Sequence, residues 1–319
     1  MTLVILAMGN IVRDMVAWVD RFPVAGDGLH PFKVLWSGGG MAGNLAHAVA
    51  RLGGKVAMVS AIGDDHWGNA IIEELQLAGV NTDYVYRRLN TTSPITIILA
   101  VPSLDRAGLV IDITPGMEIR ADEVPDELLA SARIFFTDMQ PAKPTIQVAR
   151  RAKQLGVPVA FDMQMAAQHE NLPGHHKNIL ELLTITDIFF SEEENILYFT
   201  GQENLEDAIE EILGRYPGIM LVTTRGIRGS LIATSQAFIP IPVLRVPVVV
   251  DNIGAGDAYH GAFLYTHSVL GWSLESAGVF ASATAALSCT KAGARAGLPD
   301  METVIAFLHD FKIELPDVN

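Results

Sequence analysis

The sequence predicts an α/β fold: a three-layer sandwich with a central, mostly parallel sheet and a small β-sheet that serves as a lid. Three observations predict it. Short apolar runs alternate with helical patterns between residues 134 and 223, which is typical of a parallel sheet covered on both faces. Two stretches, about 11–37 and 84–113, have β-type patterns that do not fit this alternation. From Gly254 onward the pattern is mainly helical.

Short runs rich in branched and aromatic residues predict the strands of the large sheet. In chain order these are Leu3–Met8, Val56–Ser60, Ile134–Phe136, Val157–Phe161, Ile188–Phe190 and Ile219–Thr223. Apolar residues three and four apart predict the helices. These are Met41–Leu52, Trp67–Leu77, Thr145–Leu155, Glu192–Thr200 and Leu205–Leu213. Gly53 and Gly79 follow the first two helices, as glycine often does at a helix end.

The remaining β-type segments form the lid and a hairpin. The lid takes residues 11–37 together with Tyr84–Arg88, Thr96–Val101 and Leu109–Ile113. The hairpin takes Arg228–Ala233 and Ala237–Val250, and we interpret its last part, Val246–Val250, as a buried strand. The helical pattern after Gly254 is broken near Gly293 and Gly297.

Composition limits the class of protein. The 319 residues are 50% hydrophobic and 18% charged, enough apolar material for a large core, and we expect a single domain over residues 1–319. A net charge of −14 argues against binding to nucleic acid or to an anionic membrane. The single cysteine, Cys289, excludes an internal disulfide and favours a cytoplasmic location. The N-terminal segment lacks the basic region of a signal peptide, and no apolar run is long enough to span a bilayer.

The most informative stretch follows Val246–Val250. Two glycines in Gly254-Ala-Gly256 turn the chain into a helix, so that backbone N–H groups converge at the positive end of the helix dipole. Asp257 lies beside them. A carboxylate there repels a bound phosphate, but it suits a general base that takes a proton from an attacking hydroxyl. The amides of Ala255, Gly256 and Asp257 would then stabilise the γ-phosphate charge. This short pattern alone fits a helix cap, with glycines selected for packing, equally well.

Several motifs together resemble the ribokinase-like (PfkB-type) carbohydrate kinases. The family's C-terminal signature D-T-x-G-A-G-D reads Asp251–Asp257 here, with Asn252 in place of Thr. Its N-terminal signature, G-G-x-x-x-N, reads Gly39–Asn44. Three further family motifs occur in the expected order, at Ala46–Gly53, Gly63–Gly68 and Leu75–Val80. The resemblance covers nearly the whole chain and implies ATP-dependent phosphorylation of a hydroxymethyl group, with Asp257 as base and Gly254–Gly256 as anion hole.

The resemblance also assigns the binding residues. Asp14, Gly39, Gly40 and Asn44 would hold the hydroxyl groups of the acceptor. Asp251 would order a loop that binds a monovalent cation, usually K⁺. The remaining, mostly backbone, positions of that cation site are Ile253, Ser288, Lys291, Gly293 and Gly297.

The nucleotide side follows from the same resemblance. The motif T-x-G-x-x-G places Thr224, Gly226 and Gly229 near the phosphates and ribose of ATP. Ser282 falls where the family has a polar residue that contacts the adenine. The family's N-x-x-E motif positions Mg²⁺ through water. Here it keeps Glu194 but has Ser191 in place of Asn, which puts the Ser191 contact in doubt.

The acceptor is the least determined part. The C-terminal motifs are most similar to the sulfofructose kinase and ketohexokinase-like branch, whose sulfonate-binding positions hold Gly28, Asp112 and Gln140 here. None of these is a cation, so we expect a neutral ketose or pentose. A nucleoside is the second choice, with a base covered by Met15, Trp18 and Phe32. A non-catalytic sugar- or nucleotide-binding regulator is the third. Lid sheets in this family often pair, which predicts a homodimer.

Overall fold

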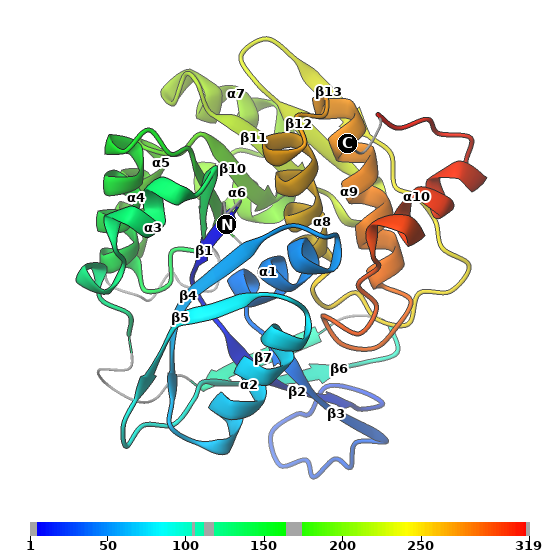
Figure 1. Ribbon diagram of the computed structural model, residues 1–319. Helices are drawn as coiled ribbons and strands as arrows, with labels where there is room; N and C mark the ends of the chain where they lie inside the picture. The colour runs from blue at the N-terminus through cyan, green and yellow to red at the C-terminus, as the bar shows by residue number, and fades with distance from the viewer. Residues whose placement is uncertain (1–4, 104–105, 112–117, 164–173, 317–319) are drawn as a thin grey trace.

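A computed structural model describes residues 5–103, 106–111, 118–163 and 174–316, and it contains a large and a small sheet (Figure 1). The large one has nine strands among these residues, in the order β13-β12-β11-β10-β9-β8-β1-β4-β5. Its strands are β1 (Ile5–Met8), β4 (Val56–Gly63), β5 (Asn81–Arg88), β8 (Ile134–Thr137), β9 (Val159–Met163), β10 (Ile188–Glu192), β11 (Met220–Thr224), β12 (Ser230–Ala233) and β13 (Phe238–Ile241). All pairs are parallel except β11–β12 and β12–β13. The predicted α/β class with a mostly parallel sheet is confirmed.

Helices cover both faces of this sheet. One layer contains α1 (Met41–Arg51), α2 (His66–Leu77), α8 (Ala255–Phe263), the π-helical turn η3 (Leu264–Val269), α9 (Leu274–Ser288) and α10 (Met301–Asp310). The other contains α3 (Asp126–Ser131), α4 (Ala142–Gln154), α5 (His175–Leu183), α6 (Glu193–Thr200) and α7 (Leu205–Arg215). Two short 3₁₀ turns are η1 (Ala121–Glu123) and η2 (Gly226–Arg228).

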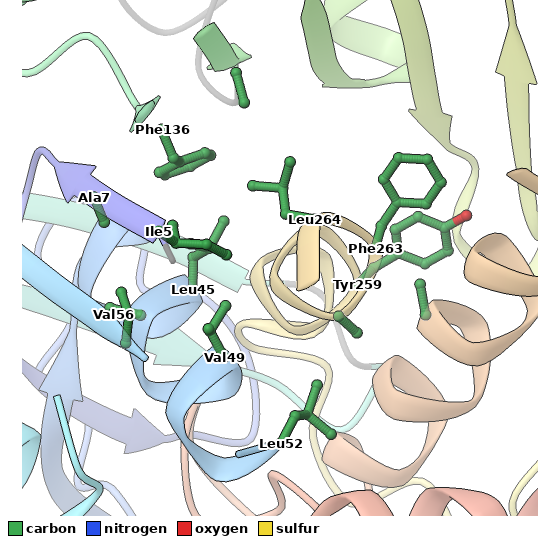
Figure 2. Packing of buried hydrophobic residues seen from close by; sticks show 14 of the residues in the cluster. Ile5, Ala7, Leu45, Val49, Leu52, Val56, Phe136, Tyr259, Phe263 and Leu264 are labelled. Atoms are coloured by element: carbon green, nitrogen blue, oxygen red, sulfur yellow. The ribbon is translucent and has the colours of Figure 1, made fainter. Parts of the chain in front are cut away.

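Strand β1 divides the core between the two layers, because successive side chains of a strand point to opposite faces. Ile5 and Ala7 belong to the cluster with α1 and α8, whereas Leu6 and Met8 belong to the cluster with α3 to α7. Figure 2 shows the first of these clusters between strands β1, β4 and β8 and helices α1 and α8. All four side chains of β1 are fully buried, which explains their continuous apolar run.

The small sheet has the order β3-β2-β6-β7 and lies apart from the large one (Figure 1). Its strands are β2 (Val12–Trp18), β3 (Lys33–Gly39), β6 (Ile95–Ala100) and β7 (Arg106–Ile111). Val16 and Ile98 on its inner face pack against Ile253 and Ala294 from the large domain. The sheet therefore covers the loops that precede α8 and α10.

Two predicted segments are wrong in detail. Tyr84–Arg88 belongs to β5, the edge of the large sheet, and not to the lid. It follows α2 in a β-α-β unit, and its alternating side chains pack into both core layers, Val85 into one and Tyr84 into the other. Val246–Val250 is an exposed irregular segment and not a buried strand. Prolines at positions 242 and 247 cannot donate ladder hydrogen bonds there.

In the part of the chain that the structure describes, no helix combines the length and the hydropathy needed to cross a bilayer.

Candidate active site

Asp257 lies in the first turn of α8, near the carboxyl ends of the central strands. Gly254 is the N-cap residue and has φ 75°, in the left-handed region. A Cβ at Gly254 would lie 2.7 Å from the Cβ of Ala294, so the site needs glycine for space as well as for conformation. The amide of Ala255 donates to the carbonyl of Asn252 at 3.3 Å. The amides of Gly256 and Asp257 are first-turn donors, which no carbonyl of α8 itself can accept from.

The carboxylate of Asp257 is 5% exposed and is held by a second helix. Asn44 of α1 donates from Nδ2 to Oδ2 of Asp257 at 2.8 Å. The two helices pack closely because Gly261 of α8 faces the carbonyl of Leu45, where a Cβ would lie only 3.0 Å away. Polar groups therefore surround Asp257, and the sequence-predicted pair Asn44 and Asp257 is brought together from positions far apart in the chain.

The predicted acceptor residues meet at the same place. The carboxylate of Asp14, on β2, occupies the space that a Cβ at Gly39 would need, with Oδ2 only 2.0 Å from that position. Gly40 has φ 84° and lies against the carbonyl of Asn10, which permits the turn into α1. Burial raises the pKa of Asp14 to about 7, against the lowering effects of Arg295 and of a hydrogen bond from Thr96; the charge of Asp257 adds to the increase.

Sequence reasoning missed Arg295, which lies behind these groups. It is 5% exposed. Its guanidinium donates to Asn44 Oδ1 at 2.9 Å and to the carbonyl of Gly39 at 2.8 Å, and it forms an ion pair with Glu74 at 3.3 Å. No local pattern around Arg295 indicated these contacts, because its partners precede it by more than 200 residues.

Asp138 was also missed. It follows β8 and is 5% exposed. Its carboxylate accepts from the backbone amides of Asn10, Ala42 and Gln140 at 2.9, 3.2 and 3.0 Å. Burial raises its pKa to about 7, although these three amides act in the opposite direction. Through these hydrogen bonds Asp138 connects the end of β1 and the start of α1 with the predicted acceptor residue Gln140.

The predicted cation loop has a well-defined frame. Asp251 is buried and accepts from the amide of Ile253 at 2.9 Å and from the amide of Gly293 at 2.9 Å. A Cβ at Gly297 would lie 2.0 Å from the carbonyl oxygen of Ser288. These contacts bring the segment before α8 together with the segment after α9. Lys291, the remaining position, is exposed.

The nucleotide-side residues lie at the ends of β10 and β11, at the start of α6, in or next to η2 and within α9. Gly226 and Gly229 have φ 55° and 84°, and Thr224 ends β11. Ser191 is fully buried and donates to the carbonyl of Met163 at 2.8 Å, so its hydroxyl is already engaged. Ser282 donates to the carbonyl of Pro242 at 2.8 Å.

The two glutamates at the start of α6, Glu193 and Glu194, differ in their surroundings. Glu193 is buried and pairs with Arg225, at 3.2 Å, and with Arg228. Glu194, the residue predicted to act on Mg²⁺ through water, is exposed. In the described residues no group of three or more His, Cys, Asp or Glu side chains is arranged to hold a metal ion directly. A hard ion held mainly by phosphates and water does not need such a group.

Two further polar contacts lie near the site. His260, one turn after Asp257, has its Nδ1 2.8 Å from Asp162 Oδ2, and both residues are buried. Burial lowers the pKa of His260, but the carboxylates of Asp162, Asp257 and Glu192 together outweigh it, so that the pKa is raised. On the lid, Arg106 reaches the turn before α8, with Nη1 3.4 Å from the carbonyl oxygen of Asn252. Arg106 is a cation that sequence reasoning did not place near the site.

The predicted residues Gly28, Phe32 and Met15 are not part of this arrangement. Asp112 lies outside the described residues. Gly28 is exposed in the segment between β2 and β3, and Phe32, proposed to cover a base, is also exposed. Met15 points to the outer face of the lid, because it alternates with the inward-facing Val16.

Known proteins are similar to this chain along nearly its whole length. The model of the pfkB family carbohydrate kinases matches residues 3–301. A ribokinase from Bacillus subtilis is 28% identical over 305 residues, covering 94% of this chain and 97% of its own. A nucleoside kinase from Methanothermobacter thermautotrophicus is 24% identical and covers 98% of both chains. The structure of Arabidopsis thaliana ribokinase complexed with ribose and ATP superposes with a TM-score of 0.81, at 25% identity, over 97% of this chain and 99% of that one.

Proposed function

Because the chain belongs to the pfkB family of carbohydrate kinases, a phosphotransferase family, we propose that it transfers the γ-phosphoryl group of ATP to a hydroxymethyl group of a small neutral sugar. A ketose or a pentose is the favoured acceptor. The observation that carries the proposal is Asp257: a nearly buried carboxyl group in the first turn of α8, which accepts a hydrogen bond from Asn44 and interacts electrostatically with Asp14.

The chemistry proposed for Asp257 is general base catalysis. The acceptor hydroxyl gives its proton to the carboxylate as its oxygen attacks the γ-phosphorus, and the bond to the bridging oxygen breaks to release ADP. The amides of Gly256 and Asp257, at the positive end of the α8 dipole, stabilise the charge on the transferring group. Asp14, Gly39, Gly40 and Asn44 hold the other hydroxyls of the acceptor.

The charges around Asp257 favour a neutral acceptor. Asp14 and Asp257 are both carboxyl groups, and they interact electrostatically. The nearest buried cation, Arg295, already contacts Asn44, Gly39 and Glu74. An acidic sugar would therefore be repelled here more than a neutral one. Arg106 lies on the side of Asn252, toward the proposed phosphate site.

ATP would bind along the carboxyl ends of β10 and β11. Thr224, Gly226 and Gly229 would approach its phosphates and ribose, and Ser282 its adenine. Mg²⁺ would be held by the phosphates and by waters, one of them on the exposed carboxylate of Glu194. Ser191 is buried and engaged with Met163, so we assign it a structural role in this arrangement.

The frame around Asp251 supports a monovalent cation. Its carboxylate accepts hydrogen bonds from the amides of Ile253 and Gly293 and so holds the segments before α8 and after α9 together. Backbone carbonyls of these two segments would be the ligands of the cation. Carbonyl oxygens are the usual ligands of K⁺. We place the cation beside the N-terminus of α8, where it would hold the two segments at a fixed distance.

A nucleoside is the alternative acceptor. Trp18, one of the lid residues predicted to cover a base, is half-buried on the inner face of the lid, and a chain similar along its whole length is a nucleoside kinase. A flat base would fit an apolar cover of this kind, whereas a sugar needs only the polar residues. The reducing compartment suggested by the single cysteine is compatible with both acceptors.

The experiment that tests the proposal measures ADP release with a panel of neutral sugars, acidic sugars and nucleosides. One neutral sugar is expected to raise turnover well above the rate of ATP hydrolysis. Asp257→Asn should then lower kcat by at least about a thousandfold while leaving ATP binding within about threefold, because it removes only the proton acceptor. Equal kcat for this variant and the wild type would refute the assigned base. Ligand binding without turnover on any acceptor would favour a regulator.

A further inference from the structure

Arg295 is a buried cation that the proposed reaction leaves without a role. It lies in the segment between α9 and α10, and its guanidinium contacts three elements: α1 through Asn44, the end of β3 through Gly39, and α2 through Glu74. The second oxygen of Glu74 accepts from the amide of Gly38 at 2.9 Å and from Arg13 at 3.0 Å. A buried arginine with this many partners is costly to place and is retained only where its contacts are satisfied.

The chain makes room for this guanidinium with two glycines. A Cβ at Gly38 would lie 2.0 Å from Nη1 of Arg295, and a Cβ at Gly43 would lie 2.7 Å from Nη2. Neither glycine has the positive φ that would require glycine for conformation. Their small size is therefore explained by Arg295 and not by a turn.

The contacts of Asn44 determine which way its amide points. Arginine has only donors, so the atom that faces Arg295 Nε at 2.9 Å is the amide oxygen of Asn44. The NH₂ group must then face Asp257, where an ionised carboxylate can only accept. One of the two N–H bonds is used by Asp257. The other has no hydrogen-bond partner among the described residues, so it is available to the hydroxyl of an acceptor.

We propose that Arg295 is a positioning residue for phosphoryl transfer, which fixes the amide of Asn44 so that its NH₂ group binds both Asp257 and the oxygen of the reacting hydroxyl. This rests on the proposed function. The hydroxyl oxygen accepts from Asn44 while its proton points to Asp257, and the contact with the Gly39 carbonyl holds the acceptor loop at the same time. Without Arg295 the amide can flip, which puts its oxygen against the carboxylate.

A double-mutant cycle tests the role in turnover. Arg295→Met is expected to lower kcat by about a hundredfold with the KM for ATP within about twofold, because the reacting hydroxyl is misplaced but the nucleotide is not. In an Asn44→Ala background the same change should lower kcat by less than about threefold, because no amide remains to orient. Arg295→Lys keeps a donor and a charge and should recover kcat to within about tenfold of wild type. Equal losses in both backgrounds would overturn the proposal and indicate a purely structural role.

A second measurement does not depend on any acceptor. In a ¹⁵N–¹H spectrum of the unliganded protein, the side-chain NH₂ signals of Asn44 are identified by their loss in Asn44→Ala. They should exchange slowly with water in the wild type and in Arg295→Lys, and at least about tenfold faster in Arg295→Met. Equal exchange in all three would sink the positioning role even if Asp257→Asn confirms the kinase. Slow exchange in the wild type with no active acceptor would instead refute the kinase alone.

If Arg295→Met does not fold, Arg295→Gln replaces it in both experiments, because the shorter glutamine side chain cannot reach both Asn44 and Gly39.

Discussion

At the scale of single residues, the site brings two carboxyl groups together in different surroundings. Asp14 is buried among lid residues, and its pKa is raised to about 7, so near neutral pH it is partly protonated. Asp257 accepts a hydrogen bond from Asn44. A protonated Asp14 can donate to an acceptor oxygen, whereas the base proposed at Asp257 must accept a proton. The two carboxyl groups are therefore proposed to have different tasks.

Asp14 should make stability depend on pH. Its folded pKa is raised from 3.8 to about 7, so as pH increases the unfolded chain ionises first and the folded state loses stability between pH 3.8 and about pH 7. Asp14→Asn removes this effect. The free energy of unfolding of the variant, relative to wild type, is expected to rise across that window by up to about 4 kcal/mol. Urea unfolding at pH 4, 5, 6, 7 and 8 measures it.

The matched control is Asp310→Asn, at an exposed carboxylate at the end of α10. The difference between this variant and wild type should be small at every pH of the series, because substitutions at exposed positions change stability little. A constant difference for Asp14→Asn as well would mean that Asp14 ionises in the folded protein as it does in the unfolded one, which would contradict its raised pKa.

Sequence reasoning identified Asp14, Asn44 and Asp257 because motifs preserve residue types at fixed spacing. It did not find Arg295 or Asp138. Arg295 is adjacent to a recognised motif, but its role depends on contacts with Asn44 and Gly39, and these exist only once α1 packs against α8. The glycines of the motifs were identified in the same way, yet the reason for Gly39, the carboxylate of Asp14 in its Cβ position, is a tertiary contact.

At the scale of elements, the position of α8 depends on its N-cap. Gly254 has φ 75° and would place a Cβ 2.7 Å from Ala294 Cβ and 2.9 Å from Ala294 Cα. Gly254→Ala should therefore destabilise the protein by about 2–4 kcal/mol, through left-handed strain and overpacking together. Because α8 must move away from Ala294, kcat should also fall by about tenfold or more. Chemical denaturation and steady-state kinetics check the two effects.

Gly271→Ala provides a matched comparison. Gly271 also has φ 75°, but within the described residues no heavy atom lies within 4 Å of the Cβ it would carry. Gly271→Ala should lower the free energy of unfolding by only the backbone strain, about 1–2 kcal/mol, and should leave kcat unchanged. If both variants lose the same stability and the same kcat, the contact with Ala294 does not position α8.

The sequence predicted long, periodic elements well and short ones less well. Trp67–Leu77 and Leu205–Leu213 lie within α2 and α7, because several turns of regular spacing specify a buried face. Val246–Val250 has the composition of a strand, but its amide at Val250 donates to the carbonyl of Cys289 in the segment after α9. A run of valines alone does not provide a neighbouring strand to pair with. Tyr84–Arg88 was assigned to the wrong sheet for the same reason: pairing partners are not encoded locally.

At the scale of the whole molecule, the small sheet has one buried and one partly exposed face. Its inner face carries Val16 and Ile98 against the large domain. On the outer face the strand register places Trp36, Met15, Ile97 and Leu109 in one row across the four strands. Trp36 at one end stacks on Trp67 of α2, with ring centroids 4.5 Å apart. Met15 and Ile97 are half-buried, and Leu109 at the other end is 62% exposed. A row of apolar side chains that is only partly buried is typical of an interface.

We therefore predict a homodimer in which the outer faces or edges of two lids pair. Leu109→Glu combined with Ile97→Glu places one charge inside that row and one at its end, and should shift the protein from dimer to monomer, raising Kd by at least about a hundredfold. Leu77→Glu is the control, because Leu77 is 83% exposed but lies at the end of α2, outside the row. Sedimentation velocity over a wide concentration range measures all three proteins. A wild type that stays monomeric throughout, or a dimer that resists both lid charges, would rule out this interface.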